Sequence, residues 1–177
     1  MPVPRIVPAV VREHAELAAF QWSQRDTLSQ EDPPDAGVIA GIDKRLEANL
    51  DGLRIAGAAA WPFVIDQFEE YPEKGELFVV AIRALETADA RRLDQALAFA
   101  RTAVDGTRGL CGAFAWLPPE TTAAVVRDWL DATDPVKIEA ALAALSAHGA
   151  NPGDRLKRLM RHDSNAVRKA LSAWMPQ

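Results

Sequence analysis

The chain has 177 residues, of which 49% are hydrophobic, so it is long and apolar enough to fold around a core. Its formal net charge of −5 at pH 7 excludes a general polyanion-binding protein. No run of roughly 18 apolar residues occurs, which excludes a transmembrane helix, and the start of the chain lacks the basic residues and long apolar stretch of a signal peptide.

Two long helices are predicted first. Pro8 suits the first turn of a helix over 8–28, whose apolar stripe is Val10, His14, Leu17, Ala18 and Trp22. Two prolines and several acidic residues make 29–35 a loop. The second helix is expected over 38–59, with a stripe of Ile39, Ile42, Leu46, Leu50 and Leu53. Gly52 and Gly57 either weaken this helix or allow a neighbouring helix to come close.

Shorter helices follow from Pro62 onward, and no segment alternates apolar and polar residues long enough to predict a strand. Pro118 and Pro119 end one helix, because proline cannot continue it. Asp134 is placed to cap the next helix, and Gly149 to end it. After the helix that begins at Pro62, the expected helices are 75–88, 90–104, 107–117, 119–132, 135–148, 153–162 and 164–175.

Four of these helices repeat one apolar spacing of i, i+4 and i+7, which marks the buried face of a helix. The four stripes are Phe78-Ile82-Leu85, Leu110-Phe114-Leu117, Ile138-Leu142-Leu145 and Val167-Leu171-Trp174. They recur at steps of 32, 28 and 29 residues, which is typical of stacked helical hairpins. We therefore expect an all-α solenoid, in which an N-terminal pair of longer helices (1–60, with a Pro-rich loop near 29–36) continues into a repeat region (61–177).

Charge is unevenly distributed along the chain. Residues 1–90 contain eight Lys and Arg against sixteen Asp and Glu, whereas residues 151–177 contain six against two. An acidic front and a basic tail would steer a partner or attract a second copy head to tail. The alternative is an ordinary solvated surface with chance clustering, and the sequence leaves both interpretations open.

Residues with the chemistry of an active site are sparse. The three histidines are too scattered for a metal site, and we expect His14 and His162 to have capping or surface roles. A single cysteine, Cys111, excludes an internal disulfide, and we interpret it as a buried structural thiol in a cytoplasmic protein. No glycine-rich phosphate loop is present. We expect no enzyme, with no catalytic, cofactor-binding or metal-binding residues and no cofactor.

The segment Asp134–Leu145 resembles a HEAT repeat of the short, lyase-like kind, and Asp163–Leu171 aligns with it at a step of 29 residues. This resemblance implies that the second helix of each pair lines the inner face, which predicts a contact strip for a partner protein. The charged residues of that strip are Arg91, Asp94, Arg101, Arg127, Asp128, Asp131, Arg155, Arg158 and Arg161. The alternative for any one of them is an ordinary solubilising charge.

The last stripe ends on Leu171 and Trp174 with no second helix to cover it. Terminal repeats normally have a polar outer face, so we expect Trp174 to be covered by the chain's own packing, by a second copy or by further sequence. Trp174 therefore joins the predicted partner-binding residues.

The front half resembles a poorly characterised proteobacterial family of HEAT-like proteins encoded near type VI secretion genes. The similar segments are Glu13–Trp22, Leu46–Gly57 and Gly75–Phe78. The resemblance implies an accessory role as an effector-binding adaptor, a co-effector or an immunity partner. The favoured function is thus a non-catalytic protein-interaction module. The alternatives are a self-assembling structural module and, because the basic tail is short for phosphate tracking, less favourably a nucleic-acid-binding protein.

Overall fold

The computed structural model describes residues 6–174, and within them the chain is helical without a strand, as predicted. The only pairing of strand type among these residues is an isolated parallel bridge between Glu73 and Val104. None of the helices in this range is long and apolar enough to cross a membrane. The helices are α1 (Pro8–Leu28), α2 (Ala36–Ala56), α3 (Trp61–Glu70), α4 (Lys74–Glu86), α5 (Ala90–Ala100), α6 (Gly106–Trp116), α7 (Pro119–Leu130), α8 (Pro135–Ala147), α9 (Leu156–Leu159) and α10 (Asn165–Ala170), with 3-10 turns at Gly57–Ala60, Gly153–Arg155 and Leu171–Trp174.

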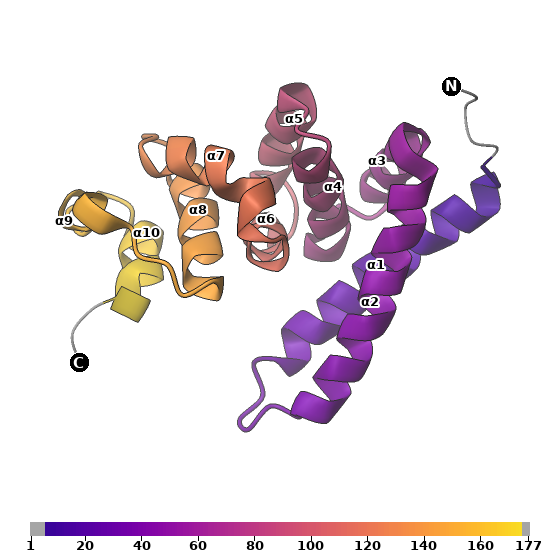
Figure 1. Cartoon of the computed structure of the whole chain (residues 1–177), viewed down its shortest axis with the longest axis horizontal. Coiled ribbons are helices and arrows are strands. Elements are labelled where there is room, and N and C mark those ends of the chain that lie inside the picture. The colour runs from indigo at the N-terminus through magenta and orange to yellow at the C-terminus, as the bar shows by residue number, and fades with distance from the viewer. Residues whose placement is uncertain (1–5, 175–177) are drawn as a thin grey trace.

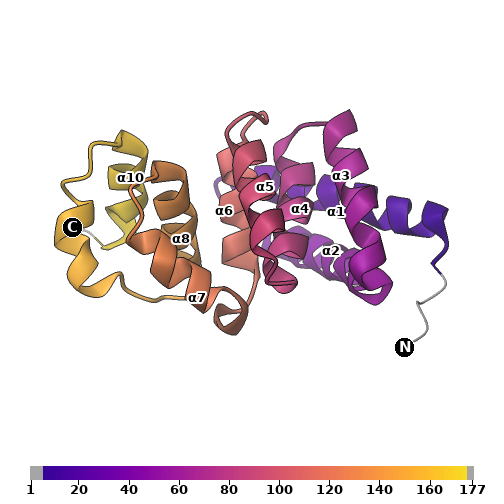
Figure 2. The same cartoon turned by 90° about the horizontal axis from the view of Figure 1, so that it is seen from above.

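The helices are arranged along one long axis (Figure 1). The long hairpin of α1 and α2 lies at one end, and α1 packs against α4. From there α4 packs against α6, α6 against α8, and α8 against α10. Helices α5 and α7 lie along one side of this row (Figure 1), and the view from above shows the same order from α3 to α10 (Figure 2).

The repeated stripes form the core, as the sequence predicts. Ten of their twelve residues are buried, and Leu145 and Trp174 are half-buried. Helix α4 is buried from Leu77 to Leu85, because α1, α3, α5 and α6 all contact it. This burial on every side explains why its sequence is apolar around almost its whole circumference.

The predicted stripe of α1 is confirmed at Ala18 and Trp22 and is about one position off before them. Val10 and Leu17 are exposed, and the buried hydrophobic residues of α1 are Val11, Ala15, Ala18, Ala19 and Trp22. The reason is close approach between helices, which favours small side chains at the contact. Gly52 of α2 lies against the His14 ring, where an added Cβ would be 2.4 Å from His14 Cδ2. The expectation that Gly52 allows close contact is therefore confirmed.

Several helices are shorter than predicted, and local geometry explains each difference. The helix expected over 90–104 ends at Ala100, because the Val104 N–H donates to Pro72 O at 3.1 Å and Asp105 has a left-handed φ of 51°. The helix expected over 153–162 is instead a 3-10 turn (Gly153–Arg155) followed by the single turn of α9. Gly153, the first residue of the 3-10 turn, has a left-handed φ of 64°.

The remaining differences lie at helix ends. The second helix begins at Ala36, two residues early, because Asp35 accepts from two backbone N–H groups. It ends at Ala56, since Gly57 has a φ of 61°. The last helix changes to a 3-10 turn at Leu171, and its predicted end at residue 175 lies outside the described residues. The predicted Asp134 cap and the end of α8 just before Gly149 are confirmed.

Candidate functional site

Helix α7 separates two grooves with apolar floors. We call the groove between α5 and α7 the acidic groove, since Asp89, Asp94 and Asp128 lie along it. Its cavity is about 330 Å³, and Leu93, Val125 and Trp129 form part of the floor. Asp89 also caps α5 and pairs with Arg92, so Asp94 and Asp128 are the carboxylates open to a ligand.

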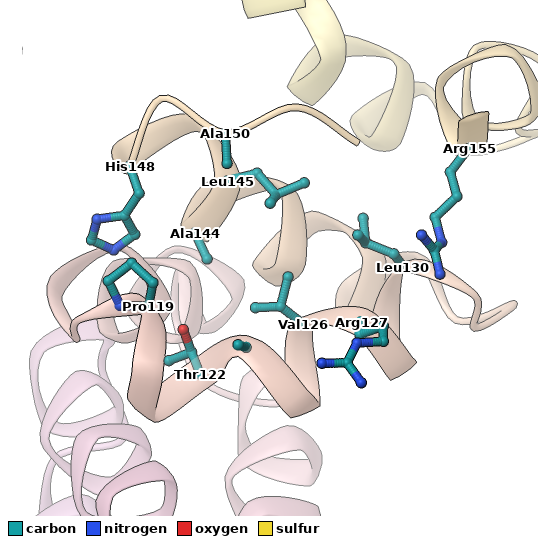
Figure 3. Close-up of a pocket in the computed structure, with 11 residues that line it drawn as sticks. Pro119, Thr122, Val126, Arg127, Leu130, Ala144, Leu145, His148, Ala150 and Arg155 are labelled. Atoms are coloured by element: carbon teal, nitrogen blue, oxygen red, sulfur yellow. The ribbon is translucent and has the colours of Figure 1, made fainter. Parts of the chain in front are cut away.

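The basic groove lies on the other side of α7, against the end of α8 (Figure 3). Its cavity is about 340 Å³, with Val126, Leu130 and Leu145 among its apolar residues. Arg127 and Arg155 lie toward one end of this groove, and His148 lies at the other (Figure 3). Both cavities fall near the lower limit of volumes that hold ligands or anchoring side chains.

Arg127 and Asp128 are neighbours in the sequence, yet they line opposite grooves. Successive residues of an α-helix point about 100° apart, so one helix can present different side chains to two neighbours. Both residues are exposed, and within residues 6–174 neither takes part in an ion pair. Their charges are therefore open to a partner on either side of α7.

The position of α7 is fixed by its buried side. Thr122 and Trp129 are buried there, and the Trp129 ring packs on the Phe114 ring with centroids 4.9 Å apart. Lys137 lies over the Trp129 ring, with Nζ 5.7 Å from the ring centroid. Pro119 starts the helix directly after Leu117 and Pro118 have adopted extended backbone. The helix therefore presents its two grooves from a rigid base.

Asp131, just after α7, binds the segment that follows α8. Its carboxylate accepts from Arg155 Nε and Nη2 at 2.8 and 2.6 Å and from Arg158 Nη2 at 3.1 Å. Hydrogen bonds from Arg155 hold the pKa of the Asp131 carboxyl below its ordinary value of 3.8. Arg158 also donates to Leu130 O at 2.6 Å. These two arginines of the basic tail thus join the segment after α8 to the end of α7 at the edge of the basic groove.

The structure divides the predicted contact strip into several places. Asp94 and Asp128 lie in the acidic groove, and Arg127 and Arg155 in the basic groove. Asp131, Arg155 and Arg158 form one cluster. Arg101 pairs instead with Asp134, and Arg91 and Arg161 are exposed outside both grooves.

Trp174 supports the wall of the basic groove. Its indole Nε1 donates to Ala150 O at 3.0 Å, and Ala150 is one of the groove residues. The half-buried ring packs against the hydrophobic core. Trp174 is therefore partly covered by the chain's own packing, which is one of the three outcomes expected for it.

Two residues of the basic groove have positions that their sequence pattern does not indicate. His148 Nε2 lies 2.9 Å from Leu117 O, and because a carbonyl only accepts, this nitrogen carries the hydrogen. Leu145, predicted as a core residue, is half-buried at the groove. The glycine signal at Gly149 places His148 at a helix end, but only the packing of α7 on α8 makes these residues part of one groove.

Cys111 and Glu139 border a separate cavity of about 620 Å³ beside α6. Burial raises the pKa of the Cys111 thiol to about 12 and also raises the pKa of the Glu139 carboxyl. The thiol is thus protonated at neutral pH, although Cys111 as a whole residue is half-buried rather than buried as predicted. Across residues 6–174, no three His, Cys, Asp or Glu side chains gather in a group that could hold a metal ion.

Comparisons of the chain with protein-family models, with curated proteins and with solved structures gave no match.

Proposed function

We propose that this chain is a non-catalytic protein-interaction module that binds a segment of a partner protein across α7. The observation that carries the proposal is the pair of apolar grooves on either side of α7, with Asp128 open to one and Arg127 open to the other. Apolar floors supply binding energy, and charges at the edges supply orientation and association rate.

The arrangement of charges defines the kind of segment that fits. A helix or extended stretch lying over α7 would place apolar side chains in both grooves, a basic side chain near Asp94 and Asp128, and an acidic side chain near Arg127. A segment turned end for end would bring like charges together, which disfavours it. The site thereby selects both composition and direction.

The proposal includes a HEAT-like solenoid as the scaffold. The packing of α4 on α6, α6 on α8 and α8 on α10 supports it, because stacked hairpins bury one another in this order. In such a scaffold the binding face exists before the partner arrives. Binding then requires little backbone rearrangement.

We further propose an accessory role beside a type VI secretion system in the cytoplasm, as adaptor, co-effector or immunity partner. This part rests on the resemblance of Glu13–Trp22, Leu46–Gly57 and Gly75–Phe78 to the HEAT-like family found near those genes. Its natural partner would be a secreted effector or a secretion component.

The experiment compares four tagged forms of the chain in the native host, with the co-purified proteins identified by mass spectrometry. They are the wild type, Asp128→Lys, Arg127→Glu and the control Asp66→Lys, which reverses an exposed charge on α3. We expect the wild type and the control to recover the same partner. Each groove variant should recover about tenfold less, equivalent to a loss of about 1.4 kcal/mol of binding free energy.

Equal recovery by all four forms would place the partner elsewhere, and recovery of no partner at any concentration would count against the module itself. The identity of the recovered protein tests the secretion role separately. A shift of labelled DNA that persists at physiological salt would favour the nucleic-acid alternative instead.

A further inference from the structure

Several large apolar side chains are exposed among residues 7–104, and three of them lie around the start of α4. Phe20 of α1 is 63% exposed, Tyr71 after α3 is 51% exposed, and Val104 after α5 is 67% exposed. Single exposed apolar residues are ordinary on a protein surface, but a group of them marks an interaction site. Whether these three residues form an interaction site therefore depends on how close they lie to one another.

Neighbouring contacts bring these three residues together. Glu16, Phe20 and Ser23 share one face of α1, and an added Cβ at Gly75, in the first turn of α4, would be 2.3 Å from Ser23 Oγ. Tyr71 lies just before that turn of α4. The Val104 N–H donates to Pro72 O at 3.1 Å, so Val104 lies beside the same turn.

Carboxylates surround this apolar group. Glu16, Glu70 and Glu73 are all exposed. The Glu70 carboxylate raises the pKa of the Tyr71 hydroxyl, with a smaller contribution from Glu16. We define the head patch as Glu16, Phe20, Glu70, Tyr71, Glu73 and Val104. It combines aromatic surface with negative charge, and its complement is a basic surface with an exposed apolar side chain.

The other end of the chain has that complement. Met160 is 41% exposed at the end of α9, Lys157 and Arg161 beside it in the chain are exposed, and Lys169 is exposed on α10. Unlike Arg155 and Arg158, which bind Asp131, these three cations take part in no ion pair within residues 6–174. We define the tail patch as Lys157, Met160 and Arg161.

We propose that the head patch of one copy of this chain binds the tail patch of a second copy. Both views place α1 to α3 at one end of the molecule and α10 at the other, so a head cannot reach its own tail (Figures 1 and 2). The contact is heterologous, since different surfaces meet, and it leaves one head and one tail free at the ends of every open assembly. Growth into short linear chains follows.

A second copy fits better than an unrelated partner because both complementary patches are present on one chain. Sixteen acidic against eight basic residues in 1–90, and six basic against two acidic in 151–177, extend the complementarity beyond the patches themselves. The attraction is largely between exposed charges and is therefore weakened by salt. The grooves beside α7 are not part of this contact and stay open to the partner proposed above.

Sedimentation velocity on the full chain tests this proposal with two variants. The head variant combines Phe20→Ala with Glu70→Gln, and the tail variant combines Met160→Ala with Arg161→Gln. The wild type should increase in average mass with concentration at low salt and return to monomer at high salt. Each variant alone should stay monomeric. An equal mixture of the two should form a 1:1 heterodimer that does not grow, since only one intact head and one intact tail remain to meet.

A wild type that is monomeric at all concentrations would overturn the proposal. So would variants that associate like the wild type, or a mixture that stays monomeric while circular dichroism shows both variants folded. The variant Asp128→Lys should assemble like the wild type and lose only the partner of the acidic groove, so failure of either proposal is distinguishable from failure of the other.

Discussion

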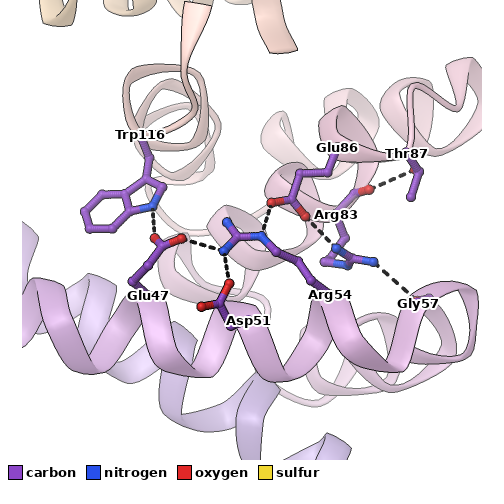
Figure 4. Close-up of polar contacts among 8 residues, drawn as sticks. All are labelled: Glu47, Asp51, Arg54, Gly57, Arg83, Glu86, Thr87 and Trp116. Carbon is purple, nitrogen blue, oxygen red and sulfur yellow. Dashed lines mark hydrogen bonds and ion pairs between the residues drawn. The ribbon is translucent and has the colours of Figure 1, made fainter. Parts of the chain in front are cut away.

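The indole Nε1 of Trp116 donates a hydrogen bond to the Glu47 carboxylate at 2.9 Å, joining α6 to α2 across 69 positions of sequence (Figure 4). The other oxygen of Glu47 accepts from Arg54, whose Nε donates to Glu86 at 2.6 Å. Glu86 in turn accepts a hydrogen bond from Arg83, which is only 5% exposed. A continuous series of charged hydrogen bonds thus attaches the N-terminal hairpin to α4 and α6.

Arg54 is the centre of this series, so Arg54→Ala should lower the free energy of unfolding by about 1–3 kcal/mol. The substitution removes a cation that pairs with Glu47, Asp51 and Glu86, and leaves Glu86 with Arg83 alone. Urea unfolding followed by circular dichroism measures the change. Arg45→Ala, at an exposed arginine of the same helix, is the control and should change stability by less than about 0.5 kcal/mol. Similar losses in both variants would mean that the series does not stabilise the fold.

Two glycine substitutions should have opposite signs. Gly109→Ala places a Cβ 2.2 Å from the backbone oxygen of Lys74, so α6 and α4 must separate, and we expect a loss of about 2–3 kcal/mol. Gly41→Ala meets nothing nearer than Arg45 Nη1 at 3.9 Å and should raise stability by about 0.5–1 kcal/mol, since alanine favours a helix. Thermal unfolding of both variants measures the difference. Equal effects would show that the contact at Gly109 is looser than the structure indicates.

The Asp26 carboxylate makes stability depend on acid pH. It is 8% exposed and accepts from Lys74 Nζ at 2.7 Å and Arg108 Nε at 2.6 Å. Burial raises its pKa, but the hydrogen bonds from Arg108 and Lys74 outweigh burial and hold the pKa below the ordinary value of 3.8. The unfolded state therefore takes up the proton first, so this contribution is present in full above pH 3.8 and is lost as pH falls through the lower folded pKa.

Asp26→Asn should accordingly cost about 1–3 kcal/mol at neutral pH, and the difference from the wild type should shrink steadily below pH 3.8. Denaturant unfolding across a series of pH values measures it. Asp66→Asn, at an exposed position of α3, serves as the control and should show a small and constant difference. If the Asp26→Asn difference stayed constant down to about pH 2, the ion pairs would not be its source.

Cys111 should be slow to alkylate in the folded protein. Burial raises the pKa of its thiol from 9.0 to about 12, so the reactive thiolate is scarce near neutral pH. A difference of three pKa units predicts a reaction with iodoacetamide about a thousandfold slower than in denaturant. Mass spectrometry over time follows the reaction, with the same chain in guanidinium as the control. Equal rates in the two states would contradict burial of the thiol.

Much of the fold was predictable because its signals are local. Proline, aspartate caps and Gly149 mark helix ends through the geometry of a few adjacent residues, and the repeated stripes mark buried faces. The sequence-based prediction was wrong where contacts with a distant segment change the local structure. Residues 101–104 were predicted to be helical, but Val104 instead donates a hydrogen bond to Pro72. The alanine-rich face of α1 was not recognised as a buried face, because it is covered only when α2 and α4 pack against it.

Local sequence patterns are enough to predict that this chain is helical, where most helices begin and end, and which side of α6 and α8 is buried. The roles of the charged side chains, in contrast, depend on contacts between segments far apart in the sequence. Arg155 and Arg158 resemble a free basic tail in the sequence, yet Asp131, 24 and 27 positions away, binds both. Arg127 and Asp128 resemble one charged strip, yet they face different grooves because α5 and α8 flank α7. A helix sets the direction of a side chain locally, whereas its neighbours, brought together by burial of the stripes, set whether that side chain is paired, covered or open.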